Sequence, residues 1–138
     1  MAVFFAWDSG RTSQNKTPFF WESPKLELIL AGKAKDEQSI VEGKYHLADG
    51  LINGYPHWIN EDETLAIWFD KEFSSWSVGD KNRLGEDYGL IAGPYGTDSY
   101  PNEIKHGWEY KDNLLAKTDT ESNGWKKASP NDVVFKVI

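Results

Sequence analysis

Cysteine is missing from the 138-residue sequence, and histidine is limited to His46, His57 and His106. Without cysteine there is no disulfide framework, thiolate metal site or thiol nucleophile. The histidines are scattered and show no HxH or HExxH spacing typical of zinc sites. The chain also has no basic, apolar leader and no run near the roughly 20 apolar residues of a membrane span. We therefore expect a cytoplasmic protein without a metal or cofactor.

Positive charge is scarce as well. Lys and Arg total 15 against 22 Asp and Glu, which gives a formal net charge of −7. An acidic protein repels phosphate, and no run of Lys or Arg provides a local exception. Nucleic acid and membranes are therefore not expected partners.

Sequence motifs of catalysis are also missing. The segment Asp119-x-Glu121-x-Asn123-Gly124 imitates the start of a calcium loop, but Pro130 occupies the twelfth position, where a bidentate carboxylate is required. There is no GxSxG nucleophile motif and no GK[ST] phosphate loop. Because 22 acidic residues produce carboxylate pairs by chance, no catalytic residue is assigned, and a small carboxylate-dependent hydrolase stays open as an alternative.

Aromatic residues, by contrast, make up 14% of the chain and recur through residues 43–110. Short apolar runs with Trp and Tyr alternate there with turn residues such as Asp49-Gly50 and Asn53-Gly54, the spacing typical of consecutive antiparallel strands. Residues 33–38 are mostly good helix formers and are followed by Gly43. The pattern predicts an all-β, antiparallel domain, sandwich or barrel-like, of about seven to nine strands with at most one short helix.

The whole chain, residues 1–138, is predicted to be a single β-domain. Residues 1–44 form an N-terminal arm and strands, residues 45–110 a Trp-rich module, and residues 111–138 a C-terminal extension. The extension ends in the alternating run VVFKVI at 133–138, which is typical of a closing strand and is expected to pair with the N-terminal arm.

The number of rings indicates a binding function, because Trp and Tyr beside Asp and Asn grip sugar rings and peptide anchors. We expect a non-enzymatic module that holds a protein or glycan ligand on an aromatic and acidic face. A third alternative is a structural subunit of a larger assembly, with homo-oligomer contacts through the N-terminal aromatic arm that includes Phe19, Phe20 and Trp21. The candidate ligand-binding residues, from loops near 56–58, 73–76 and 94–100, are Tyr55, His57, Trp58, Trp76, Tyr95 and Tyr100.

Several spaced elements of residues 45–110 agree in order with a known pattern. They are Asn53-Gly54-Tyr55-Pro56-His57-Trp58, Ala66-Ile67-Trp68-Phe69, Trp76-Ser77-Val78-Gly79, Leu84-Gly85, Gly89-Leu90-Ile91-Ala92 and Pro101 to Trp108-Glu109-Tyr110. This order resembles a small Trp-rich β-module that recurs singly or in tandem in multidomain proteins of protists and invertebrates. The resemblance implies a β-fold and a binding role without catalytic residues. Tyr100 stands where related modules tend to have cysteine, which fits a reducing compartment.

Overall fold

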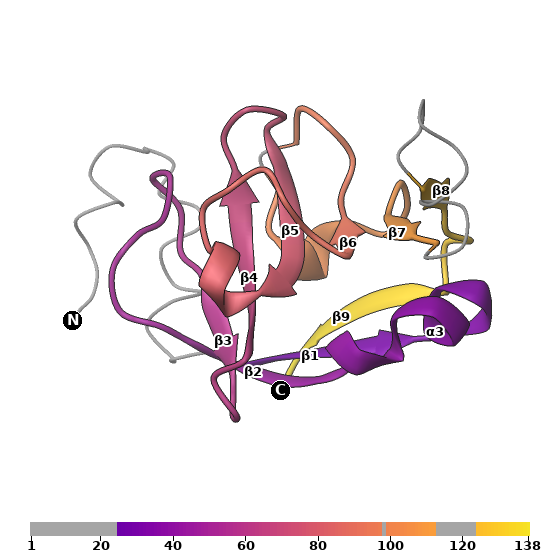
Figure 1. The fold of residues 1–138 in the computed structure, drawn as a ribbon, viewed down its shortest axis with the longest axis horizontal. Helices are drawn as coiled ribbons and strands as arrows, with labels where there is room; N and C mark the ends of the chain where they lie inside the picture. The colour runs from indigo at the N-terminus through magenta and orange to yellow at the C-terminus, as the bar shows by residue number, and fades with distance from the viewer. Residues whose placement is uncertain (1–24, 98, 113–123) are drawn as a thin grey trace.

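The nine strands of the computed structural model belong to one antiparallel sheet that curls into a half-barrel (Figure 1). The structure describes residues 25–97, 99–112 and 124–138. Along the sheet the strand order is β8-β7-β6-β5-β4-β3-β2-β1-β9, and the all-β prediction is confirmed. The strands are β1 (Lys25–Leu30), β2 (Gly43–Leu47), β3 (Trp58–Asn60), β4 (Leu65–Asp70), β5 (Ser75–Asp80), β6 (Ile91–Ala92), β7 (Glu109–Lys111), β8 (Trp125–Lys127) and β9 (Val133–Val137).

The predicted short helix is α3 (Gly32–Gln38), which is followed by a 3-10 turn, η1 (Ser39–Val41). Ala34 and Gln38 are buried, as expected for positions four apart on one helix face. The side-chain amide of Gln38 donates a 2.7 Å hydrogen bond to the backbone carbonyl of Lys111 in β7. The helix is thereby fixed against a strand far from it in the sequence.

Alternation along β4 and β5 builds the centre of the core. Phe69 pairs with Trp76 and Ile67 pairs with Val78, and all four side chains are buried on the inner face of the sheet. Successive strand residues point to opposite faces, so the residues between them face outward. The outward set includes Trp68, which is buried by a separate contact described below.

The turn between β2 and β3 follows the predicted chemistry. Asn53 and Gly54 both have positive φ, 56° and 87°, in a turn bracketed by a bridge between Ile52 and Tyr55. Asn and Gly are the residues that adopt this left-handed conformation most readily. The Asn53 side chain also donates a 2.8 Å hydrogen bond to the Phe69 carbonyl, which ties the turn to β4.

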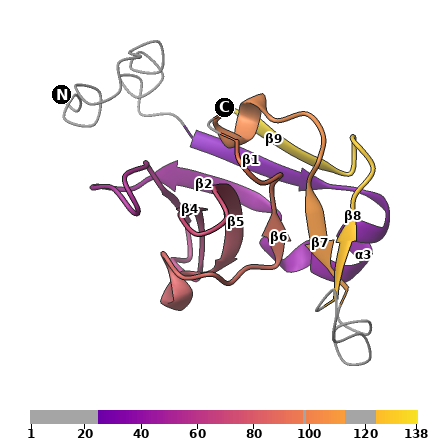
Figure 2. The ribbon, with the colours of Figure 1, turned by 90° about the horizontal axis from the view of Figure 1, so that it is seen from above.

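The two ends of the strand order approach each other because the sheet curls. In Figure 2 β9 lies across from β7, and α3 lies beside β7. The rings of Trp108, which precedes β7, and Phe135 in β9 are 4.7 Å apart between centroids. These contacts close the core on a side where the strands of the described residues do not pair.

The C-terminal strand β9 pairs with β1, from Leu26 opposite Val137 to Leu30 opposite Val133. The expected pairing with the N-terminal region is therefore confirmed for the part that is described. Residues 1–24, which contain the aromatic arm, lie outside the described residues. No helix in the described ranges is long and apolar enough to span a bilayer.

Candidate functional site

The candidate residues from the sequence divide into exposed and buried positions. Tyr95 is 69% exposed and Tyr55 is half-buried, whereas the remaining four are at most 5% exposed. The expected exposure of those four side chains is wrong, because they lie inside the curled sheet and under its turns. Their role as ligand contacts stays a prediction, but the side chains do not lie on the surface, where that role requires them. The four buried residues are His57, Trp58, Trp76 and Tyr100.

Trp76 is the centre of the buried aromatic cluster. Its ring lies 5.8 Å from that of Trp58 and 5.3 Å from that of Phe69, both in edge-to-face geometry. Its indole N–H donates a 2.7 Å hydrogen bond to the carbonyl of Ser99. Such geometry is typical of packed rings with a satisfied polar atom, so Trp76 serves the core.

His57 is packed near the turn at Asp49 and Gly50. Burial lowers the pKa of its imidazole, and this outweighs the opposing effects of a hydrogen bond to the Gly50 backbone and the charge of Asp49. The lowered pKa favours the neutral ring at physiological pH. Within the described residues, no three His, Asp or Glu side chains are grouped in a way that could hold a metal ion.

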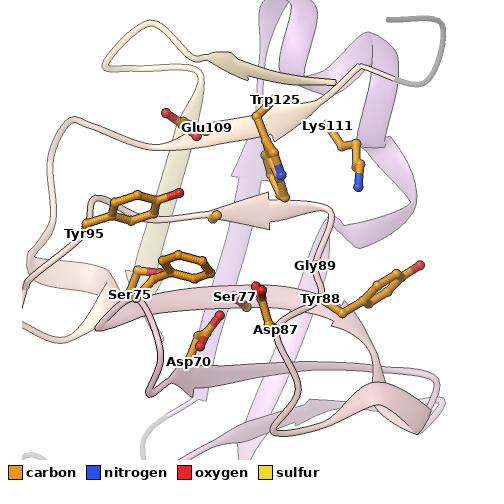
Figure 3. Close-up of a pocket in the computed structure, with 12 residues that line it drawn as sticks. Asp70, Ser75, Ser77, Asp87, Tyr88, Gly89, Tyr95, Glu109, Lys111 and Trp125 are labelled. Carbon is orange, nitrogen blue, oxygen red and sulfur yellow. The ribbon is translucent and has the colours of Figure 1, made fainter. Parts of the chain in front are cut away.

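A groove of about 270 Å³ lies on the outer face of the sheet, opposite the aromatic core (Figure 3). Strand alternation accounts for its floor: Asp70 of β4 pairs with Ser75 of β5, and Ser77 pairs with Ala92 of β6. Ala92 in turn pairs with Glu109 of β7. These side chains face away from Trp76 and Val78, so the sheet brings together residues from three hairpins on one polar surface.

The segment between β5 and β6 folds over this outer face and forms one wall of the groove. It covers Trp68, whose indole N–H donates a 3.1 Å hydrogen bond to the carbonyl of Glu86. Gly79 and Gly89 permit this approach, because a Cβ on Gly79 would stand 3.2 Å from the Gly89 Cα. The wall carries Asp87 and Tyr88 into the lining of the groove.

Aromatic rings stand on two sides of the groove. The rings of Phe73 and Tyr95 stack 5.1 Å apart with an interplanar angle of 20°. Their loops are joined by a backbone hydrogen bond from Gly96 N–H to the Phe73 carbonyl at 3.3 Å. On another side Trp125 of β8 enters the groove, with the Lys111 ammonium 5.3 Å from its ring centroid (Figure 3).

Two carboxyl groups line the groove, that of Asp70 from the floor and that of Asp87 from the wall. Asp70 is only 4% exposed and accepts a 2.9 Å hydrogen bond from the Glu72 N–H. Burial is the main cause that raises the pKa of Asp70, and Asp87 raises it further, whereas backbone N–H groups of Glu72 and Phe73 oppose the shift. The raised pKa means that Asp70 binds a proton more tightly in the folded protein than in the unfolded chain.

Replacing Asp70 with Asn is expected to stabilise the protein at neutral pH. The pKa of Asp70 is higher in the folded state, so the folded state binds the proton more tightly and wild-type stability falls as pH rises through the raised pKa. Asn keeps the acceptor for Glu72 and can donate to Asp87 without a charge to titrate. Urea unfolding between about pH 3 and pH 7 should show D70N more stable by about 0.5–2 kcal/mol above this window, with the difference shrinking at acid pH. Lower stability of D70N at every pH would contradict this consequence of the raised pKa of Asp70.

The sequence indicated only part of this groove. Phe73 and Tyr95 lie in two of the three predicted loops, whereas the loop at 56–58 contributes no side chain to the lining. The sequence did not indicate Asp70, Asp87 or Trp125 as site residues, although all three line the groove. The available signal was the alternation in FSSWSVG, because Trp76 and Val78 on the inner face place Ser75 and Ser77 together on the other.

Comparison of the chain with protein-family models, curated proteins and solved structures found no match. The resemblance to the Trp-rich module stays a prediction, and the functional argument depends on the groove itself.

Proposed function

We propose that the chain is a carbohydrate-binding module that holds its sugar in the groove on the outer face of the sheet. The observation that carries the proposal is the combination of aromatic rings at the sides with hydroxyl and carboxyl groups on the floor. Sugar rings have an apolar face that packs on aromatic side chains and hydroxyl groups that need hydrogen-bond partners. Both kinds of partner are present within one small concave surface.

The rings are suited to contact without a large entropic cost. Tyr95 is exposed, but its stack on Phe73 and the backbone bonds between their loops restrict its position. Trp125 is half-buried and contacts the Lys111 ammonium through its ring face. Because these side chains are already held in place, a ligand orders little on binding.

The size of the groove favours a sugar over a protein surface. Its volume of about 270 Å³ is close to the lower end of small-molecule sites, roughly 300–1,000 Å³. A stable protein interface buries roughly 800 Å² on each partner and is usually flat and wide. One or two sugar units suit the groove better.

Alanine replacement of Trp125 is expected to weaken sugar binding by roughly 10-fold to 100-fold, since a buried aromatic contact typically contributes more than 1 kcal/mol. Purified protein would first be applied to an array of immobilised neutral, amino and acidic oligosaccharides, and positive sugars titrated by calorimetry. Tyr95→Ala should behave similarly. Leu51→Ala, which removes an exposed apolar side chain outside the groove, is the control.

Two results would overturn the proposal. One is the absence of any sugar binding on the array by folded wild-type protein. The other is sugar binding that persists unchanged in both W125A and Y95A, because the ligand would then lie elsewhere. Release of reducing ends from a bound oligosaccharide would instead establish hydrolysis.

A further inference from the structure

The charges in the groove are unequal. Of the described residues that line it, Asp70, Asp87 and Glu109 carry carboxyl groups and Lys111 carries an ammonium group. None of these four side chains forms a salt bridge to another described residue. In Figure 3 Lys111 lies beside Trp125, apart from the Asp70 and Asp87 carboxyl groups at the floor. The floor therefore favours a ligand with positive charge.

Two buried hydroxyl groups flank the carboxyl pair. Ser75 and Ser77 are 3% and 4% exposed and line the groove. Both side chains lie on the outer face of β5, where a ligand in the groove can hydrogen-bond to their hydroxyl groups.

The aromatic walls favour the same charge. The faces of Trp and Tyr rings are electronegative and attract cations. The Lys111 ammonium already lies over the Trp125 ring, which shows that this face accepts a cation in the folded protein. The stacked pair of Phe73 and Tyr95 adds a second aromatic surface beside the carboxyl groups.

We propose that the groove selects sugars that carry a free primary amine over neutral and acidic sugars. This inference rests on the proposed function. The protonated amine donates to the carboxyl groups of Asp70 and Asp87. The sugar hydroxyl groups bond Ser75 and Ser77, and the apolar ring face packs on the aromatic walls.

The test compares three oligosaccharides of equal length: glucosamine with free amines, N-acetylglucosamine and glucose. Calorimetric titration at slightly acidic pH, where the amines are protonated, should give at least tenfold tighter binding of the free-amine sugar. This preference should weaken with added salt, because it depends on charge. The measured quantity is the ratio of the dissociation constants of two sugars for the same protein. A general loss of binding changes both constants alike and leaves this ratio unchanged.

Asp87→Asn is the informative variant, because Asp87 is exposed and its replacement leaves the core intact. D87N should lose most of the preference for the amine, leaving a ratio of dissociation constants within about threefold, or about 0.7 kcal/mol, whatever its effect on binding of the glucose oligomer. Glu61→Gln removes the same charge from an exposed turn away from the groove and should keep the wild-type ratio.

The outcomes separate this inference from the proposed function. Equal binding of all three sugars by wild-type protein would overturn amine selection and leave carbohydrate binding in place. An unchanged ratio in D87N would overturn the assignment of Asp70 and Asp87 as the groups that bind the amine. Binding of none of the sugars, together with binding of a lysine-containing peptide in the same groove, would overturn both proposals, since the cation would then belong to a protein.

Discussion

Replacing Trp76 with alanine is expected to lower the free energy of unfolding by about 3–5 kcal/mol, the usual range for truncating a buried aromatic residue. Its ring is completely buried and contacts those of Trp58, Phe69 and Tyr55 at centroid distances of 5.8, 5.3 and 5.9 Å. The change also leaves the Ser99 carbonyl without its indole donor. Domains are usually stable by about 5–15 kcal/mol, so a loss of this size removes a large part of the free energy of unfolding.

Urea unfolding followed by circular dichroism measures this loss, and two variants calibrate it. Trp76→Phe keeps much of the packing and removes the hydrogen bond, so it should cost less than Trp76→Ala. Trp125→Ala removes the same side chain from a half-buried position at the groove and should change stability by no more than about 1 kcal/mol. If W76A and W125A were equally stable, Trp76 would not be at the centre of the core.

Strand positions could be predicted from the sequence because they are encoded locally. The run LAIWF at 65–69 alternates, and it forms β4 with Ile67 and Phe69 inward. The helix former run at 33–38 likewise matches α3. β8 was not predicted, since its three residues have no alternation to detect and it exists through its pairing with β7. Short edge strands of this kind depend on their neighbours rather than on their own sequence.

The exposure of Trp58, Trp76 and Tyr100 was predicted wrongly because a count of rings does not give the capacity of the core. The expectation took the number of rings in the chain as a sign that some of these side chains lie on the surface. The sheet curls around Trp58 and Trp76, and Trp68 is buried on the opposite face under the segment between β5 and β6. Two separate apolar layers therefore hide rings that one layer could not.

The groove could not be predicted from the sequence, because only the pairing register of the strands brings its residues together. Asp70, Asp87 and Glu109 are separated by 17 and 22 positions in the chain. They meet because β4, β5, β6 and β7 pair in one specific alignment and because Gly79 lies against Gly89. A slip of one residue in any pair would turn the floor residues to the inner face. Sequence alternation tells which residues share a face of one strand and says nothing about the alignment between strands.

The second large effect is expected where the half-barrel closes. Replacing Trp108 with leucine or alanine should lower the free energy of unfolding, by about 3–5 kcal/mol for alanine. Trp108 is 2% exposed, its indole N–H donates to the Ile104 carbonyl at 3.1 Å, and its ring lies 4.7 Å from that of Phe135. No strand pairing in the described residues joins β7 to β9, so the two sides are held by this contact together with the packing of α3 on β7.

A double-mutant cycle on Trp108 and Phe135 isolates that closing contact. Trp108→Leu, Phe135→Leu and the double variant keep apolar side chains, so each should remain folded enough for urea unfolding. The double variant should lose less than the sum of the single losses, with a coupling of about 0.5–1.5 kcal/mol for the aromatic pair. A matched cycle with Leu51→Ala, an exposed change in the turn between β2 and β3, should be additive. Additivity of the Trp108 and Phe135 losses would mean that the curl is held by α3 and the Gln38 hydrogen bond instead, because these also join β7 to the N-terminal part of the sheet.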